Sequence, residues 1–124
     1  MDCIFCKIVR GEIPTKLVGE TEHSIAFKDI APRQPVHILI VPKNHSRDIT
    51  ELAAKDPDAL VDLVRLGTKL AAEYSTGSFR LSFNTGAEAG QSVFHAHGHI
   101  TSTTPSGLAS TSADEKVSGP VDSE

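Results

Sequence analysis

Apolar and polar residues alternate along this chain in a way that predicts several β-strands. The run from Val36 to Val41 is apolar apart from one histidine and rich in β-branched residues, which indicates a buried central strand. Farther on, Phe79, Leu81 and Phe83 alternate with polar residues, as in a strand with one buried face. The predicted strands cover residues 16–20, 23–30, 36–41 and 79–84, and a fifth lies within residues 93–101.

One long helix is predicted where apolar residues recur at spacings of three and four. Asp56 suits the N-cap, and Pro57 suits the first helical position because its φ angle is fixed. The apolar face then includes Leu60, Leu63, Val64, Gly67, Leu70, Ala71 and Tyr74. A short helix is predicted over residues 5–13, which lead into a Gly and Pro turn. The order of these elements predicts an α+β domain with an antiparallel sheet.

Composition divides the chain of 124 residues into one small domain and a polar tail. Residues 102–124 consist mainly of Ser, Thr, Gly, Pro and acidic residues, so we expect them to be disordered and the domain to cover residues 1–101. The tail holds four acidic residues and one lysine, a charge of −3 out of the formal total of −4. The remaining body, at −1, is nearly neutral.

That charge balance bears on the possible partners of the protein. A near-neutral body gives no reason to expect nucleic-acid binding, because proteins that bind polyanions usually carry a basic patch. No run approaches the roughly 18 apolar residues of a membrane span. The N-terminus also lacks a basic stretch followed by an apolar one. We therefore expect a cytoplasmic protein with neither a nucleic-acid nor a membrane partner.

Three of the six histidines occupy alternate positions, at His95, His97 and His99. In a β-strand, alternate side chains lie on one face, about 6.6 Å apart along the chain. Imidazoles arranged in this way are suited to share one phosphate or one metal ion. The loop over residues 85–92 contains two glycines and leads into this segment, where its backbone N–H groups suit an anion.

Both cysteines of the chain lie in one CxxC motif, formed by Cys3 and Cys6. In a reducing compartment this pattern favours a metal or redox role over a structural disulfide. Zinc commonly takes two cysteines and two histidines, and His45 and His95 are candidates for the other two ligands. The alternative is that the cysteines are simply small buried residues.

Four segments together resemble the histidine triad family: Cys3–Val9, Phe27–Ile30, His37–His45 and Gly90–Ile100. The similarity spans about residues 3–101 and is greatest to the branch of nucleoside phosphoramidate hydrolases. It implies a five-stranded antiparallel sheet with one long and one short helix. It also implies a homodimer in which the two sheets join.

The resemblance implies a nucleotide site and a covalent mechanism. The ligand would be a purine nucleotide or a nucleoside phosphoramidate. His97 matches the nucleophile, which attacks the α-phosphorus to form a nucleotidyl-imidazole intermediate that water hydrolyses. His99 and Ser92 match groups that stabilise charge on the phosphate or leaving group, and His37 matches a histidine that tunes this network.

Other residues match binding positions of the family. Asp29 matches the acceptor for ribose hydroxyls and Asn84 a polar contact to the nucleotide, although each residue alone also fits an ordinary turn. The backbone of Gly90, Gln91 and Ser92 matches phosphate-binding elements. The matching base pocket comprises Ile4, Phe5, Phe27, Ile30 and Leu39, and the matching zinc ligands are Cys3, Cys6, His45 and His95.

Two departures from the family keep alternatives open. Gly98 replaces a bulky residue beside His97, so we expect a more permissive backbone there. Thr101, Ser102 and Thr103 stand where the branch often has Gly-Gly-Arg, and the chain has no Trp. The alternatives are a nucleotidyltransferase, a dinucleoside polyphosphate phosphorylase or hydrolase, and a catalytically weak adaptor that binds nucleotide and zinc.

Overall fold

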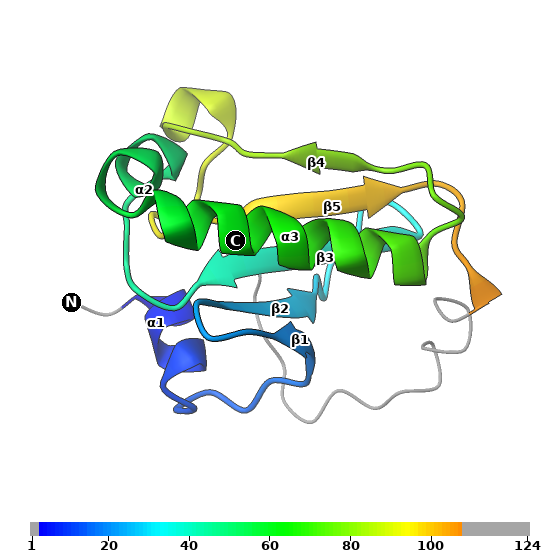
Figure 1. Ribbon diagram of the computed structural model, residues 1–124, viewed down its shortest axis with the longest axis horizontal. Coiled ribbons are helices and arrows are strands. Elements are labelled where there is room, and N and C mark those ends of the chain that lie inside the picture. Colours follow the sequence, from blue (N-terminus) through cyan, green and yellow to red (C-terminus); the bar gives the residue numbers. More distant parts are fainter. Residues whose placement is uncertain (1–2, 108–124) are drawn as a thin grey trace.

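The computed structural model describes residues 3–107 and contains a five-stranded sheet crossed by a long helix (Figure 1). All neighbouring strands are antiparallel, in the order β1-β2-β3-β5-β4. The strands are β1 (Leu17–Glu20), β2 (Ser24–Lys28), β3 (Val36–Pro42), β4 (Arg80–Ser82) and β5 (Gly98–Ser102). This arrangement confirms the predicted α+β class and the five-stranded antiparallel sheet.

Strand β3 is the centre of the sheet and is buried along its whole length. It pairs with β2 on one side and with β5 on the other, where Leu39 lies opposite His99. Because side chains alternate between the two faces of a strand, Ile38 and Ile40 enter one hydrophobic core while Leu39 and Val41 enter another. The predicted central strand is therefore confirmed, and it separates two cores.

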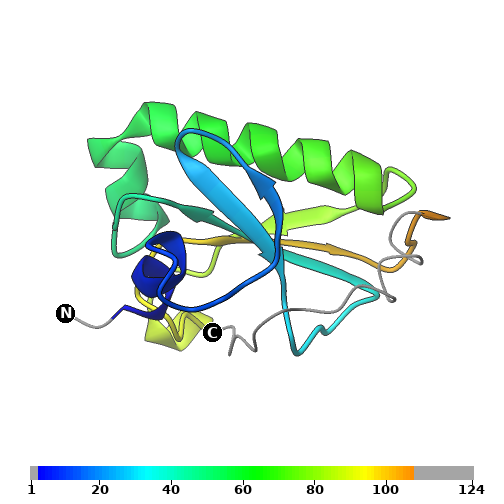
Figure 2. The ribbon, with the colours of Figure 1, turned by 90° about the horizontal axis from the view of Figure 1, so that it is seen from below.

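The first core lies beneath helix α3 (Pro57–Tyr74), which covers one face of the sheet (Figure 2). Asp56 caps this helix as expected, since its Oδ1 atom accepts a hydrogen bond from Ala59 N at 3.2 Å. A Cβ atom at Gly67 would lie 2.3 Å from the Cδ1 atom of Ile40, so this glycine permits the helix to approach the central strand closely.

The second core lies on the opposite face, where helix α1 (Ile4–Val9) packs (Figure 2). Phe5 is fully buried there against Phe27, with ring centroids 5.8 Å apart. The helix ends earlier than predicted because Gly11 adopts a φ of 77°, which a continuing helix does not allow.

Among residues 3–107, no helix has the length and apolar character required to span a bilayer.

Two helical elements were not predicted: α2 (Ile49–Lys55) and a short 3₁₀ turn, η1 (Ala87–Ala89). Asp48 caps α2 by accepting a hydrogen bond from Glu51 N at 2.9 Å, and the Glu51 carboxylate accepts one from Arg47 N at 2.6 Å. An acidic residue three positions after an N-cap is a recognisable start signal. Asp48 and Glu51 have this spacing in the sequence.

The strand predicted around the three histidines is shorter than expected. Strand β5 begins at Gly98, so His95 and His97 precede it and only His99 belongs to it. The segment that contains His95 and His97 is bound to the loop after β3 instead, because Ala96 N donates a hydrogen bond of 2.7 Å to the carbonyl oxygen of Ser46 in that loop. The histidines are therefore brought together by a loop contact as well as by strand pairing.

The folded part of the chain also extends beyond the predicted boundary at residue 101. Strand β5 includes Ser102, and Ser106 N donates a hydrogen bond of 3.0 Å to the carbonyl oxygen of Tyr74 at the end of α3. Thr76 N likewise donates to the carbonyl oxygen of Thr104 at 2.9 Å. The expected disorder of the tail falls mainly on residues 108–124, which lie outside the described residues.

Gly98 is not the permissive position that the sequence suggested. A Cβ atom there would lie 2.9 Å from the Cε1 atom of Phe83 and 3.2 Å from the Cδ1 atom of Leu81. The space of the missing side chain is therefore filled by Phe83 and Leu81 from the β4 region, and Gly98 itself is buried. Packing, rather than a side chain on the strand, holds the backbone next to His97.

We expect Gly98→Ala to lower the free energy of unfolding by about 1–3 kcal/mol, because it overpacks a filled space. In a Phe83→Leu background the same substitution should cost less, since the aromatic Cε1 atom is gone. Urea unfolding of wild type, both single variants and the double variant measures the two costs. If the costs of the two single variants add up to the cost of the double variant within about 0.5 kcal/mol, the two residues do not interact and this packing account is contradicted.

Candidate functional site

Four potential metal ligands converge where α1 meets the loop after β3 and the segment before β5. Cys3, Cys6, His45 and His95 each present one donor atom, and all four atoms lie within 4.8 Å of one another. The Nδ1 atom of His95 is 3.2 Å from Cys3 Sγ, 3.5 Å from Cys6 Sγ and 3.2 Å from His45 Nδ1. The structure thus brings together the four residues predicted as zinc ligands.

The separations in this cluster match those around a tetrahedral zinc ion. Bonds of about 2.05 Å to nitrogen and 2.3 Å to sulfur place two nitrogens about 3.3 Å apart and a sulfur and a nitrogen about 3.6 Å apart. The observed nitrogen pair is 3.2 Å apart, and the sulfur to nitrogen distances are 3.2, 3.5 and 3.5 Å. These four separations lie close to those of a tetrahedral site, as binding of zinc by the four side chains would require.

His95 also has the protonation state that a ligand requires. Its Nε2 atom lies 2.8 Å from the carbonyl oxygen of Pro42, which only accepts hydrogen bonds, so Nε2 carries the hydrogen. The lone pair is then on Nδ1, the atom that faces the cysteines and His45. Burial raises the pKa of the Cys6 thiol to about 11, and a bound cation would reverse this because zinc binds thiolates.

The imidazole of His97 is oriented by the backbone immediately before it. Its Nδ1 atom lies 2.7 Å from the carbonyl oxygen of His95, so Nδ1 carries the hydrogen and Nε2 has the lone pair. The side chain is buried, and the ring of Phe5 packs edge to face against it with centroids 5.1 Å apart. An oriented neutral imidazole with a free Nε2 is suited to act as a nucleophile.

A second chain of hydrogen bonds orients His99. Arg33 N donates to His37 Nδ1 at 3.2 Å, so neutral His37 carries its hydrogen on Nε2. That atom is 3.0 Å from His99 Nδ1 and 3.4 Å from the Oδ2 atom of Asp29. Because His99 Nδ1 is the nearer acceptor, His99 retains its hydrogen on Nε2.

Burial keeps these imidazoles neutral at ordinary pH. It lowers the pKa of His97 and of His37, and it lowers the pKa of His99 to about 4, with the nearby His97 and His37 acting in the same direction. The centroids of the His97 and His99 rings lie 5.0 Å apart. The site therefore places a lone pair on His97 next to an N–H donor on His99.

The loop before the histidines is held by Gln91, whose side chain is buried. Its Oε1 atom accepts a hydrogen bond from Gly86 N at 2.8 Å, and its amide nitrogen donates to the carbonyl oxygens of Arg47 at 2.8 Å and Val93 at 3.1 Å. This side chain joins the 85–92 loop to the segment before α2. Its role in the described structure is to shape the loop, while the predicted phosphate contact concerns its backbone.

Comparison with known proteins identifies the family. Residues 2–113 match the family described as "Scavenger mRNA decapping enzyme C-term binding". A protein of Synechocystis named as an uncharacterized HIT-like protein is 43% identical over 100 residues, which are 80% of this chain and 88% of that protein. The chain belongs to the histidine triad (HIT) family.

Two solved structures of HIT proteins resemble this fold closely. A HIT family hydrolase from Clostridium thermocellum has a TM-score of 0.76 at 39% identity, and the match covers 81% of this chain and 89% of that one. A histidine triad nucleotide-binding protein from Candida albicans has a TM-score of 0.71 at 33% identity, covering 86% and 80% of the two chains. These likenesses confirm the predicted family and fold, but not the phosphoramidate hydrolase branch.

The remaining predicted residues of the HIT site differ in exposure. Ser92 and Asn84 are exposed, and the Asn84 amide lies beside Gly90, which adopts a φ of 97°. The Asp29 carboxylate is only 1% exposed and accepts a hydrogen bond from Ala31 N at 2.8 Å. Its described contacts are thus with the protein, and its contact with ribose stays a prediction.

The predicted base pocket consists largely of core residues in this HIT domain. Phe5, Phe27 and Leu39 have at most 1% of their surface exposed, whereas Ile30 is 42% exposed. Ile4 is half-buried at the edge of the second core. Of these five residues, Ile30 has the most surface to offer a base, and the pocket stays a prediction. The contact of Phe5 with His97 was not foreseen, because no local pattern reports it.

Proposed function

We propose that this HIT protein is a nucleotide-binding hydrolase that cleaves nucleoside phosphoramidates or related nucleotidyl compounds at the α-phosphorus. The observation that carries the proposal is the hydrogen bond from His97 Nδ1 to the carbonyl oxygen of His95, which leaves the Nε2 lone pair free. The names of the solved relatives support the reaction class and the ligand class, since one is called a hydrolase and another a nucleotide-binding protein.

In the proposed reaction, His97 Nε2 attacks the α-phosphorus and the phosphorus to nitrogen bond of the substrate breaks. The leaving amine takes the bonding electron pair and a proton from solvent, and the water that attacks in the next step returns a proton to solvent. Water then attacks the same phosphorus, the bond to Nε2 breaks, and the imidazole is regenerated. The His99 N–H donor and the Ser92 hydroxyl would stabilise charge on the phosphate or the leaving group.

Replacement of the nucleophile tests this mechanism. We expect His97→Gly to abolish turnover of an adenosine phosphoramidate and to retain binding of adenosine monophosphate, because the variant removes the attacking imidazole and leaves the proposed nucleotide-binding groups Asp29 and Ser92 in place. Wild-type protein quenched during turnover should carry a nucleotidyl group on the peptide that contains His97, detectable by mass spectrometry.

His23→Gly is a suitable control, because His23 lies in the connection between β1 and β2 and takes no part in the cluster. Substantial turnover by His97→Gly without added imidazole would rule out the proposed nucleophile. Parallel reactions with inorganic phosphate distinguish a hydrolase, which gives the nucleoside monophosphate, from a phosphorylase, which gives the diphosphate.

We also propose that Cys3, Cys6, His45 and His95 hold one zinc ion. Bound zinc would supply a closed structural crosslink between α1, the loop after β3 and the segment before β5. The match of the donor distances to tetrahedral geometry supports this assignment.

Metal analysis of protein purified without chelator should find about one zinc per chain, as four protein ligands imply. The double variant Cys3→Ser with Cys6→Ser should lose the metal, because a hydroxyl is a poor zinc ligand, whereas His23→Gln should retain it. A wild-type protein without zinc, or a double variant with full zinc, would refute the site.

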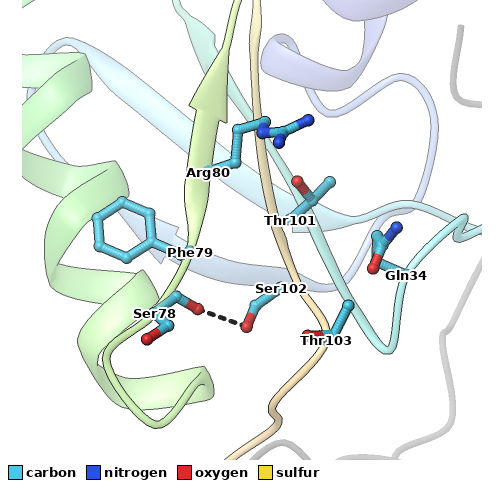
Figure 3. Close-up of a pocket in the computed structure, with 7 residues that line it drawn as sticks. All are labelled: Gln34, Ser78, Phe79, Arg80, Thr101, Ser102 and Thr103. Carbon is cyan, nitrogen blue, oxygen red and sulfur yellow. Dashed lines mark hydrogen bonds between the residues drawn. The ribbon is translucent and has the colours of Figure 1, made fainter.

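The proposal extends to a homodimer formed through β4. This strand pairs with β5 on one side, and within residues 3–107 its other edge pairs with no strand. Phe79, just before the strand, is 39% exposed, and a hollow of about 310 Å³ adjoins it. The hollow is lined by Phe79 together with Arg80, Thr101 and Gln34, and Figure 3 shows Phe79 on one side of the β4 ribbon and these three residues on the other. An unpaired edge strand beside an exposed aromatic ring is suited to pair with a second copy.

Light scattering after size exclusion should give about twice the 13.2 kDa mass of one chain. Phe79→Asp should shift the protein towards monomer, because it places a charge at the proposed interface. Val61→Asp is the matched control, since Val61 is 49% exposed on α3, and it should leave the mass unchanged. A monomeric wild type, or equal effects of the two variants, would exclude this interface.

A further inference from the structure

His95 belongs to the metal cluster and to the catalytic arrangement at the same time. Its Nδ1 atom faces the two cysteines, its Nε2 atom donates to the carbonyl oxygen of Pro42, and its own carbonyl oxygen accepts the hydrogen bond from His97. Its side chain is fully buried. A change in the backbone at His95 would therefore displace both its imidazole and the carbonyl oxygen that orients the His97 ring.

Phe5 is a second link between the cluster and His97. It lies in α1 between the two cysteines, and its ring contacts both histidine rings, at 5.9 Å from His95 and 5.1 Å from His97. The planes of Phe5 and His97 are nearly perpendicular, at 88°. The orientation of the Phe5 ring against the His97 ring therefore depends on the position of α1.

Helix α1 depends on contacts outside itself. It has only six residues, and helices this short are unstable in isolation. Its N-terminal turn is held by Cys3, whose sulfur accepts a hydrogen bond from Cys6 N at 3.3 Å. Ligation of both cysteines would fix this turn relative to His45 and His95, and would thereby fix Phe5.

We propose that the cluster of Cys3, Cys6, His45 and His95, when it holds its metal, positions the nucleophile His97 through the His95 carbonyl and the Phe5 ring. The metal does not contact the substrate in this arrangement. It acts as a positioning element, and the fraction of protein that holds the metal determines the fraction in which His97 Nε2 points at the α-phosphorus. For its activity measurements the inference rests on the proposed function.

Misplacement of a reacting atom by about 1 Å costs on the order of 100-fold in rate. Loss of the metal should therefore lower kcat by about 10- to 100-fold, while KM changes little because the groups that bind nucleotide stay in place. If the metal were purely structural, its loss would instead lower the melting temperature and leave kcat unchanged in the fraction of protein that stays folded.

The first experiment needs no substrate. Protein labelled with ¹⁵N-histidine is compared by NMR before and after chelation of its zinc. In the metal-loaded protein we expect His97 to be the Nδ1–H tautomer, as its hydrogen bond requires, and after chelation to show a mixture of tautomers. His23 serves as the internal control and should not change. An unchanged His97 signal in folded, metal-free protein would overturn the proposal.

The second experiment separates Phe5 from the metal. Phe5→Leu keeps all four ligands, so it should retain zinc and remain folded, yet lower kcat by about 10-fold with little change in KM. Ile8→Val is the matched control, since Ile8 is buried in the same helix and the same core but has no aromatic ring to pack against His97. Equal kcat values for these two variants would contradict the role of the Phe5 ring.

A variant of the opposite core controls for general loss of stability. Leu66→Ala, beneath α3, should lower the melting temperature and leave kcat at low temperature unchanged. If His97 proves not to be the nucleophile, turnover is uninformative but the NMR comparison still decides whether the metal orients its ring. If chelation unfolds the protein, the zinc-loaded Phe5→Leu variant still tests the link, and a normal kcat and His97 tautomer there would refute it.

Discussion

The hydrogen bond between His97 Nδ1 and the carbonyl oxygen of His95 is the interaction on which the site depends. It determines which nitrogen of His97 carries a lone pair, and it exists only because His95 is held in place. His95 in turn is fixed by the carbonyl oxygen of Pro42 and by full burial next to the cysteine pair. The end of the central strand, the N-terminal helix and the histidine segment therefore meet at one residue.

The two faces of the sheet pack against different kinds of residue. One face packs against α3 and contains the aliphatic core, in which Gly67 allows the helix to approach Ile40. The other face carries the histidines, Phe5 and the cluster of Cys3, Cys6, His45 and His95, so residues of chemical interest are buried next to aromatic side chains. This burial lowers the pKa values of His97 and His99 and keeps them neutral, as the proposed nucleophilic attack by His97 requires.

Local patterns predicted what depends on local physics. The continuous apolar run of β3 and the Asp56 cap with the periodic face of α3 each depend on neighbours in the chain, and each was predicted nearly to the residue. Helix α2 was missed although its cap was visible. Strand β5 was predicted too long, because the position of His95 and His97 depends on a hydrogen bond to Ser46, about fifty residues away.

Spacing and residue type were sufficient to predict the fold class, the family resemblance and which cysteines and histidines lie close together. How these residues act on one another depends on contacts between segments far apart in the chain. The tautomer of His95 follows from the carbonyl oxygen of Pro42, and that of His99 from contacts with Arg33 and His37 that are equally distant in the chain. The tautomer of His97 follows from the carbonyl oxygen of His95, whose own position these distant contacts help to fix. Gly98 shows the same limit, since the side chain that fills its space belongs to Phe83, and no pattern along one strand reports what packs against it.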